Sequence, residues 1–167
     1  MDNELRQVLE GVREGRLTVD EAAVRLRSEP FRDIGYAKVD LHRKTRQGAA
    51  EVIYGAGKTP EQIAGIADVM VERGQGPILI TRLAEEAAAA VAKTHPLDYH
   101  RAARVGIIGQ LPPPGGLGTV VVATGGTSDM PVAEEAALTA EVLGNRVTRL
   151  YDVGVAGLHR LLANLEP

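Results

Sequence analysis

Hydrophobic residues recur with helical spacing in the first 30 positions of the chain. Four apolar residues lie three and four positions apart: Leu5, Val8, Leu9 and Val12. Gly15 ends this run, and Thr18 starts a second helix with capping-box spacing to Glu21. The pattern predicts a helical hairpin over residues 1–30, which has too little core to fold alone and must dock elsewhere.

From residue 36 the pattern changes to short apolar runs that alternate with helical periods. It predicts strands over residues 36–41, 51–54, 77–81 and 104–108. Between them it predicts a helix that opens at Thr59-Pro60-Glu61-Gln62 and an alanine-rich helix over Leu83–Lys93. These elements indicate a small α/β domain over residues 31–110. Residues 111–118 hold three prolines and three glycines and read as a linker.

The remainder, residues 119–167, predicts a strand, a helix, a second strand and a second helix. The run Thr119–Thr124 suits a central parallel strand, and Val147–Tyr151 is the next strand. The inward face of the first helix is expected to carry Val132, Ala136, Ala140 and Leu143. This is the first part of a doubly wound parallel sheet, with an open edge left over. We therefore expect either a chain that stops early or a partner that completes the sheet.

Composition and charge exclude several classes of function. The 167 residues are 44% hydrophobic and 25% charged, with a net charge of −3. The composition is globular, and the charge argues against a nucleic-acid partner. There is no cysteine, which excludes a zinc–thiolate site or a cysteine nucleophile within these residues. No apolar run is long enough for a membrane span, and no signal peptide stands at the start, so we expect a cytoplasmic protein.

The strongest chemical signal is the turn Gly125-Gly126-Thr127-Ser128-Asp129 between a buried strand and a helix. Glycines permit close approach of a ligand, and the first N–H groups of a helix favour an anion. Thr127 and Ser128 add hydroxyl donors at the carboxyl end of a strand, where ligands bind in parallel sheets. The alternative is that Ser128 or Asp129 only caps the helix.

Two further stretches carry candidate residues. Arg43 and Arg46 belong to a basic cluster between strands, and their guanidinium groups suit phosphate or carboxylate, although a solvated loop explains the cluster too. Asp152 follows a predicted strand at its carboxyl end. The histidines indicate no site: His159 is expected within a helix, and His95 and His100 on the surface.

Three stretches together resemble the LarB family of nickel-pincer cofactor biosynthesis, which is related to the aminoimidazole-ribotide carboxylase PurE. They are Asp40–Gly48 with Glu51–Thr59, Thr124–Ala136 and Tyr151–Arg160. The resemblance implies a carboxylase and hydrolase that acts on nicotinic acid adenine dinucleotide. Such an enzyme adds a carboxylate to the pyridinium ring from CO2 or bicarbonate, splits the phosphoanhydride and releases AMP. It also implies magnesium, and a homo-oligomer that is an octamer in the full-length family.

The resemblance assigns site residues one by one. Gly126, Thr127, Ser128 and Asp129 match the Gly-Ser-x-Ser-Asp turn with which PurE-type enzymes hold phosphate and ribose. Gly125 precedes that turn, Arg43 and Arg46 would contact an anionic part of the substrate, and Asp129 and Asp152 are the candidate catalytic groups.

The sequence departs from both families. PurE has a Ser-Ala-His-Arg segment with a catalytic histidine near the place where Gly154-Val155-Ala156-Gly157 stands here. LarB chains continue further and carry a nucleophilic cysteine, whereas this chain resembles about two-thirds of a LarB chain. We therefore expect an incomplete, inactive fragment of a LarB-type enzyme. The alternatives are a PurE-like carboxylase or mutase and a nucleotide-binding module without catalysis.

Overall fold

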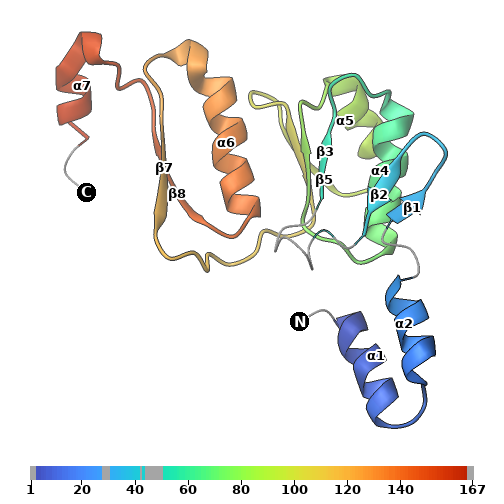
Figure 1. The fold of residues 1–167 in the computed structure, drawn as a ribbon. Coiled ribbons are helices and arrows are strands. Elements are labelled where there is room, and N and C mark those ends of the chain that lie inside the picture. Colours follow the sequence, from blue (N-terminus) through green and yellow to red (C-terminus); the bar gives the residue numbers. More distant parts are fainter. Residues whose placement is uncertain (1–2, 28–30, 42, 44–50, 165–167) are drawn as a thin grey trace. The chain divides into compact units, whose positions relative to one another are not determined.

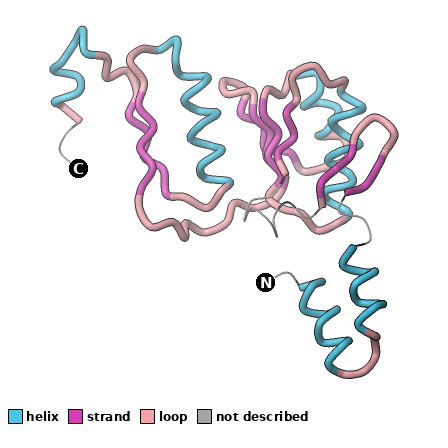
Figure 2. Tube along the Cα trace, viewed as in Figure 1, coloured by secondary structure: helices cyan, strands magenta, loops and turns pink. Residues whose placement is uncertain are grey.

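A computed structural model describes residues 3–27, 31–41, 43 and 51–164 of the chain (Figures 1 and 2). The chain divides into two compact units, Met1–Glu51 and Val52–Pro167, and each is described by itself. Helices and mixed sheets confirm the α/β class. The predicted domain boundaries at residues 30, 110 and 118 stay predictions.

The first unit holds a helical hairpin and a two-stranded sheet. Helices α1 (Asn3–Arg13) and α2 (Val19–Arg27) are joined by a short turn. At the start of α2 the Thr18 N–H donates to the Glu21 carboxylate at 2.7 Å and the Glu21 N–H donates to the Thr18 hydroxyl at 3.1 Å, which confirms the capping box. Strands β1 (Phe31–Asp33) and β2 (Lys38–Asp40) pair antiparallel, and β1 was not predicted.

The second unit begins with a four-stranded sheet of order β3-β4-β6-β5. Its strands are β3 (Val52–Tyr54), β4 (Ile78–Thr81), β5 (Leu97–His100) and β6 (Val105–Ile108). β3 is parallel to β4, and β6 is antiparallel to both β4 and β5. The carboxyl ends of β3, β4 and β5 therefore lie at one edge, where β6 begins. Every residue of β4 and β6 is buried, so these two central strands form the core.

Helices α4 (Pro60–Glu72) and α5 (Glu85–Val91) follow β3 and β4. The predicted capping box at Thr59 is confirmed, because the Gln62 N–H donates to the Thr59 hydroxyl and the Gln62 side chain accepts from the Thr59 N–H. Ile63, Ala67 and Met70 form the buried face of α4. After α5, His95 hydrogen-bonds Asp68 of α4 at 2.6 Å, and its side chain is only 12% exposed. The expectation that His95 lies on the surface is wrong, because this contact draws the ring against α4.

The rest of the second unit is one strand–helix–strand crossover and a terminal helix. β7 (Thr119–Ala123) and β8 (Arg146–Leu150) pair in parallel, joined by the short 3-10 turn η1 (Thr127–Asp129) and helix α6 (Met130–Val142). η2 (Val155–Gly157) and α7 (Leu158–Leu162) follow β8. Figure 1 shows α6 alongside β7 and β8. No helix in the described ranges is both long and apolar enough to cross a membrane.

Helix α6 packs with a different face from the one predicted. Its buried residues are Ala133, Ala137 and Leu138, whereas Val132 and Leu143 are 60% and 50% exposed. Leu138 packs in one cluster with Leu79 and Ile107 of the four-stranded sheet. The predicted face was wrong because α6 packs against that sheet as well as against β7 and β8. β7 itself is largely exposed, unlike a central strand.

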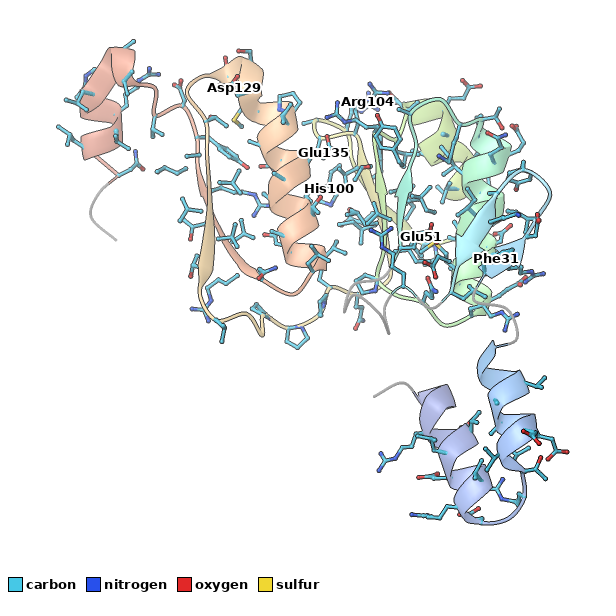
Figure 3. The ribbon with its side chains drawn as sticks, viewed as in Figure 1. Phe31, Glu51, His100, Arg104, Asp129 and Glu135 are labelled. Atoms are coloured by element: carbon cyan, nitrogen blue, oxygen red, sulfur yellow. The ribbon has the colours of Figure 1, made fainter. Side chains whose placement is uncertain are left out.

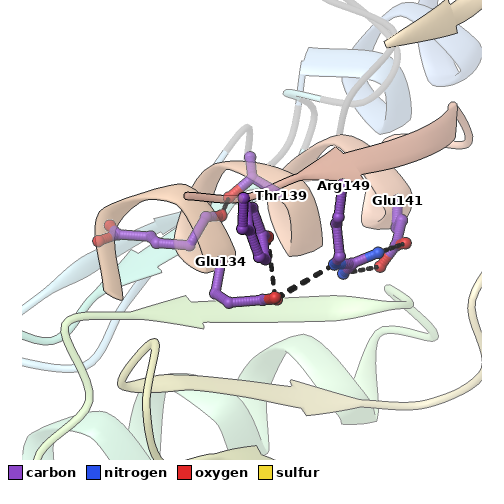
Figure 4. A network of polar contacts seen from close by, with 6 residues as sticks. Glu134, Thr139, Glu141 and Arg149 are labelled. Carbon is purple, nitrogen blue, oxygen red and sulfur yellow. Dashed lines mark hydrogen bonds and ion pairs between the residues drawn. The ribbon is translucent and has the colours of Figure 1, made fainter. Parts of the chain in front are cut away.

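A charged network fixes α6 on β8 (Figure 4). The guanidinium of Arg149 donates to both carboxylate oxygens of Glu141, at 2.6 and 3.0 Å, and its Nε donates to Glu134 at 3.3 Å. The Tyr151 hydroxyl donates to the same Glu134 carboxylate at 2.8 Å. The hydrogen bonds from Arg149 hold the pKa of Glu141 below its usual range. A fork-to-fork pair of this kind is stronger than a single contact, so it sets the position of α6 along β8.

We expect Glu141→Gln to lower the free energy of unfolding at neutral pH by about 1–2 kcal/mol, because the Arg149 and Glu141 side chains are only 31% and 24% exposed and the pair is charge-assisted. The folded pKa of Glu141 is depressed, so this stability is present above the unfolded pKa of about 4.3 and is lost as pH falls through the folded pKa. Urea unfolding of both proteins should show a difference that shrinks below about pH 4.

The matched control is Glu85→Gln, which removes an ion pair with Arg101 whose two side chains are 61% and 76% exposed. It should change stability by less than about 0.5 kcal/mol. Equal losses in the two variants, or a loss in Glu141→Gln that does not depend on pH, would contradict the assigned role of the network.

Candidate functional site

The backbones that follow β7 and β8 continue side by side beyond the ends of the strands. The Val153 N–H donates to the Thr124 carbonyl at 2.9 Å, and the Gly154 N–H donates to the Gly125 carbonyl at 3.0 Å. The buried Thr124 hydroxyl accepts from the Asp152 N–H at 3.0 Å. We call these residues, 124–125 and 152–154, the seam. It holds the two candidate loops together at the carboxyl edge of the parallel pair.

The seam requires a glycine at position 154. A Cβ atom there would lie 2.3 Å from the Gly125 carbonyl oxygen. Gly154 has ordinary backbone angles, with φ of −58°, so its requirement is for space and not for a special conformation. By contrast, a Cβ atom at Gly126 would meet nothing within 4 Å. The two glycines therefore have different structural roles although both lie at the predicted site.

The turn before α6 is closed by its own aspartate. The Gly126 N–H donates to the Asp129 carboxylate at 3.1 Å, and the Asp129 N–H donates back to the Gly126 carbonyl at 3.2 Å. The alternative that Asp129 caps α6 with its side chain is wrong, because Gly126 is the N-cap of η1 and the Asp129 side chain makes no capping hydrogen bond at the start of α6. Thr127 and Ser128 are exposed, and in the described residues neither hydroxyl has a hydrogen-bond partner. Figure 3 shows Asp129 at the start of α6. The turn thus presents two free hydroxyls at a helix N-terminus.

Asp152 lies just beyond β8 with φ of 57°, a left-handed conformation that non-glycine residues seldom adopt. Its carboxylate pairs with Arg160 of α7 at 2.6 Å. The other terminal nitrogen of Arg160 donates to the Gly154 carbonyl at 3.4 Å. Arg160 is a residue of this site that sequence reasoning missed, because a pair eight positions apart depends on the turn between them. His159 is exposed in α7, as expected.

Arg43, a candidate binding residue from the sequence, belongs to the first unit. The Nε of Arg43 is buried without a hydrogen-bond partner in the part of the chain that is described. The Asp40 N–H donates to the neighbouring Glu51 carboxylate at 2.6 Å. Burial raises the pKa of Glu51. The hydrogen bond from the Asp40 N–H and the charge of Arg43 lower this pKa, and the charge of the Asp40 carboxylate raises it, so the net shift is upward. Arg46 lies outside the described residues.

The described residues contain no group of three or more acidic or histidine side chains that could hold a metal ion. At the candidate site, Asp129 is engaged with Gly126 and Asp152 with Arg160. These residues alone therefore do not form a resident magnesium site, which would need several free oxygen ligands.

Comparison with known proteins gives two matches. The family model described as the LarB/PurE-like N-terminal domain matches residues 31–110. An uncharacterized protein of Methanocaldococcus jannaschii is 33% identical over 174 residues, and the match covers 99% of this chain and 68% of the relative. The first match includes β1 to β6, and the second includes the seam.

We expect Gly154→Ala to destabilise the second unit by about 1–3 kcal/mol, because the added methyl group must push the two backbones of the seam apart. Chemical denaturation monitored by circular dichroism measures the loss. The matched control is Gly126→Ala, in the facing loop, where the methyl group enters open space and stability should change by less than about 0.5 kcal/mol. A Gly154→Ala protein as stable as the control would show that the seam is not closely packed.

Proposed function

The chain belongs to the LarB/PurE-related family, and on that premise we propose that it binds nicotinic acid adenine dinucleotide at the seam. The family is one of carboxylase-type enzymes. We propose the LarB reaction, in which the pyridinium ring is carboxylated and the phosphoanhydride is hydrolysed with release of AMP, in nickel-pincer cofactor biosynthesis. The observation that supports it is the pair of free hydroxyls, Thr127 and Ser128, at the start of α6.

Binding of the dinucleotide in the second unit would use groups of the turn before α6. The Thr127 and Ser128 hydroxyls donate to a phosphate oxygen, next to the positive end of the α6 dipole. Gly125 and Gly126 keep side chains away from the approaching phosphate. Asp129 accepts from a ribose hydroxyl with the carboxylate oxygen that Gly126 does not use. For the first unit we propose separately that Arg43, whose Nε has no hydrogen-bond partner among the described residues, and Arg46 bind an anionic group of the substrate.

The chemistry limits what these residues do in the reaction. A pyridinium ring is electron-poor and does not attack CO2 until a nucleophile has added to it. In LarB enzymes that nucleophile is a cysteine, and none occurs among these 167 residues. Asp129 and Asp152 would make poor substitutes, because a carboxylate adduct reverts readily. We therefore propose that both aspartates orient the reactants, which are the dinucleotide and CO2 or bicarbonate. Magnesium would arrive with the phosphates, since it binds through substrate phosphates and one or two carboxylates.

We also propose that the protein forms a homo-oligomer in the cytoplasm. The observation in favour of association is that apolar side chains on β7 and after β8 are exposed, at Val121, Val155 and Leu158. Exposed apolar residues mark an interface where they form a contiguous patch.

Replacement of Ser128 tests the binding site. Ser128→Phe places a ring where the phosphate would lie, so we expect the dissociation constant for nicotinic acid adenine dinucleotide to rise by about tenfold or more in calorimetry. The control is Thr119→Phe, at the opposite end of β7 and also exposed, which should bind as the wild type does. Melting temperatures of both variants guard against misfolding. Normal binding by Ser128→Phe would contradict the proposed binding site, and the turn would then have only a structural role at the start of α6.

A product assay tests the two carboxylase functions against each other. We expect these 167 residues, incubated with nicotinic acid adenine dinucleotide, magnesium and carbon-labelled bicarbonate, to bind the dinucleotide and form no labelled product. Label in a pyridinium product would contradict the need for a cysteine. Turnover of aminoimidazole ribotide would favour a PurE-like carboxylase instead. The absence of any nucleotide binding would contradict both enzyme functions.

A further inference from the structure

The edge where β3, β4 and β5 end and β6 begins carries four basic residues. They are Lys58, Arg82, Arg101 and Arg104, each within four residues of a strand end. The strand ends are in direct contact: the Gly55 N–H donates to the Thr81 carbonyl at 2.8 Å, and the Leu83 N–H donates to the Arg104 carbonyl at 2.7 Å. The residues after β3, after β4 and before β6 are therefore neighbours in space. Figure 3 shows Arg104 at this end of the sheet.

Two of these arginines have a backbone that a glycine would adopt at lower cost. Arg82 has φ of 52° and Arg104 has φ of 53°. The left-handed region costs an ordinary residue about 1–2 kcal/mol. Among the described residues only one other non-glycine residue has positive φ, and that is Asp152 at the seam. Strained residues of this kind cluster at functional sites, which gives a reason to ask what the two arginine side chains do.

The guanidinium groups keep donors available. Arg82 uses its Nε to bind Glu135 of α6, at 2.8 Å, and in the described structure its two terminal nitrogens have no partner. Arg104 is exposed and has no partner there either. The Lys58 ammonium donates one hydrogen to the Tyr54 carbonyl at 2.8 Å and keeps two. Arg101, in contrast, is paired with Glu85.

Several acids lie near this edge. Glu135 is held by the Nε of Arg82, Glu85 by Arg101 and Asp98 by His100, and Glu61 and Glu86 stand in the first turns of α4 and α5. The N-terminus of α4 is nearby, but its capping box already satisfies the Gln62 N–H, so the donors considered are those of the side chains. Arginine terminal nitrogens and an ammonium group suit the oxygens of a phosphoryl group, which accept several hydrogen bonds and carry the opposite charge.

We propose that Arg82 and Arg104, together with Lys58, bind a phosphoryl group at this edge of the four-stranded sheet. Glu135 holds the Arg82 guanidinium by one nitrogen and so orients its other two. The site is independent of the turn at residues 125–129 and takes the phosphoryl group of a nucleotide or of a free polyphosphate. It does not rest on the proposed dinucleotide reaction.

Inorganic pyrophosphate and ADP are the probes, each titrated by calorimetry into the 167-residue chain. Arg82→Asn and Arg104→Asn remove the guanidinium, and asparagine accepts the left-handed backbone that each position requires. We expect either change to raise the dissociation constant for pyrophosphate by about tenfold. The matched control, Arg101→Asn, lies in the same turn and should change it by less than about twofold. Tighter binding of ADP than of pyrophosphate would identify a nucleotide ligand, and equal binding a free polyphosphate.

A second measurement covers the case in which a variant is unstable. Pyrophosphate added to the wild type should shift the amide resonances of residues 82–83 and 104–105. The same shifts should persist in Ser128→Phe, which separates this site from the turn before α6. Unchanged affinity in Arg104→Asn, an equal loss in Arg101→Asn, or shifts confined to residues outside this edge would overturn the proposal.

Discussion

The backbones of Gly125 and Gly154 approach so closely that a methyl group on the second would lie 2.3 Å from the carbonyl oxygen of the first. This contact extends the parallel pairing of β7 and β8 past the ends of the strands. Because of it, the hydroxyls before α6 and the Asp152–Arg160 pair belong to one edge. Without it, the two loops would separate as ordinary surface loops do. The site therefore depends on the absence of a side chain at one position.

Helix α6 places this edge with respect to the rest of the second unit. On one side Arg149 of β8 binds Glu141, and on another Leu138 packs against the core strands of the larger sheet. Glu135 of the same helix binds Arg82 at the end of β4. One helix thus carries the charged residues that tie together the two sheets of this unit. Left-handed backbone at Arg82, Arg104 and Asp152 shows that both sheet edges contain charged residues in costly conformations.

Local sequence patterns were sufficient to predict those elements whose structure depends on residues close together in the chain. The start of α4 follows from Thr59 and Gln62, and the position of the turn at residues 125–129 follows from its glycines and hydroxyls. Contacts between residues far apart in the chain could not be predicted from such local patterns. β5 escaped prediction because Leu97-Asp98-Tyr99-His100 has little apolar character, and it is a strand through its pairing with β6. The buried face of α6 was missed because alanine and valine occur all round that helix. Arg160 was missed because its partner lies across a turn.

Amide hydrogen exchange, with and without nicotinic acid adenine dinucleotide, tests most directly whether a nucleotide binds where the two loops meet. We expect slower exchange in the presence of the dinucleotide at residues 124–129 and at residues 152–157 together, because one ligand would contact both sides of the seam. Residues 143–146, at the opposite end of the β7–β8 pair, should exchange at the same rate in both samples. Slowing at neither loop, or equal slowing at residues 143–146, would contradict the account.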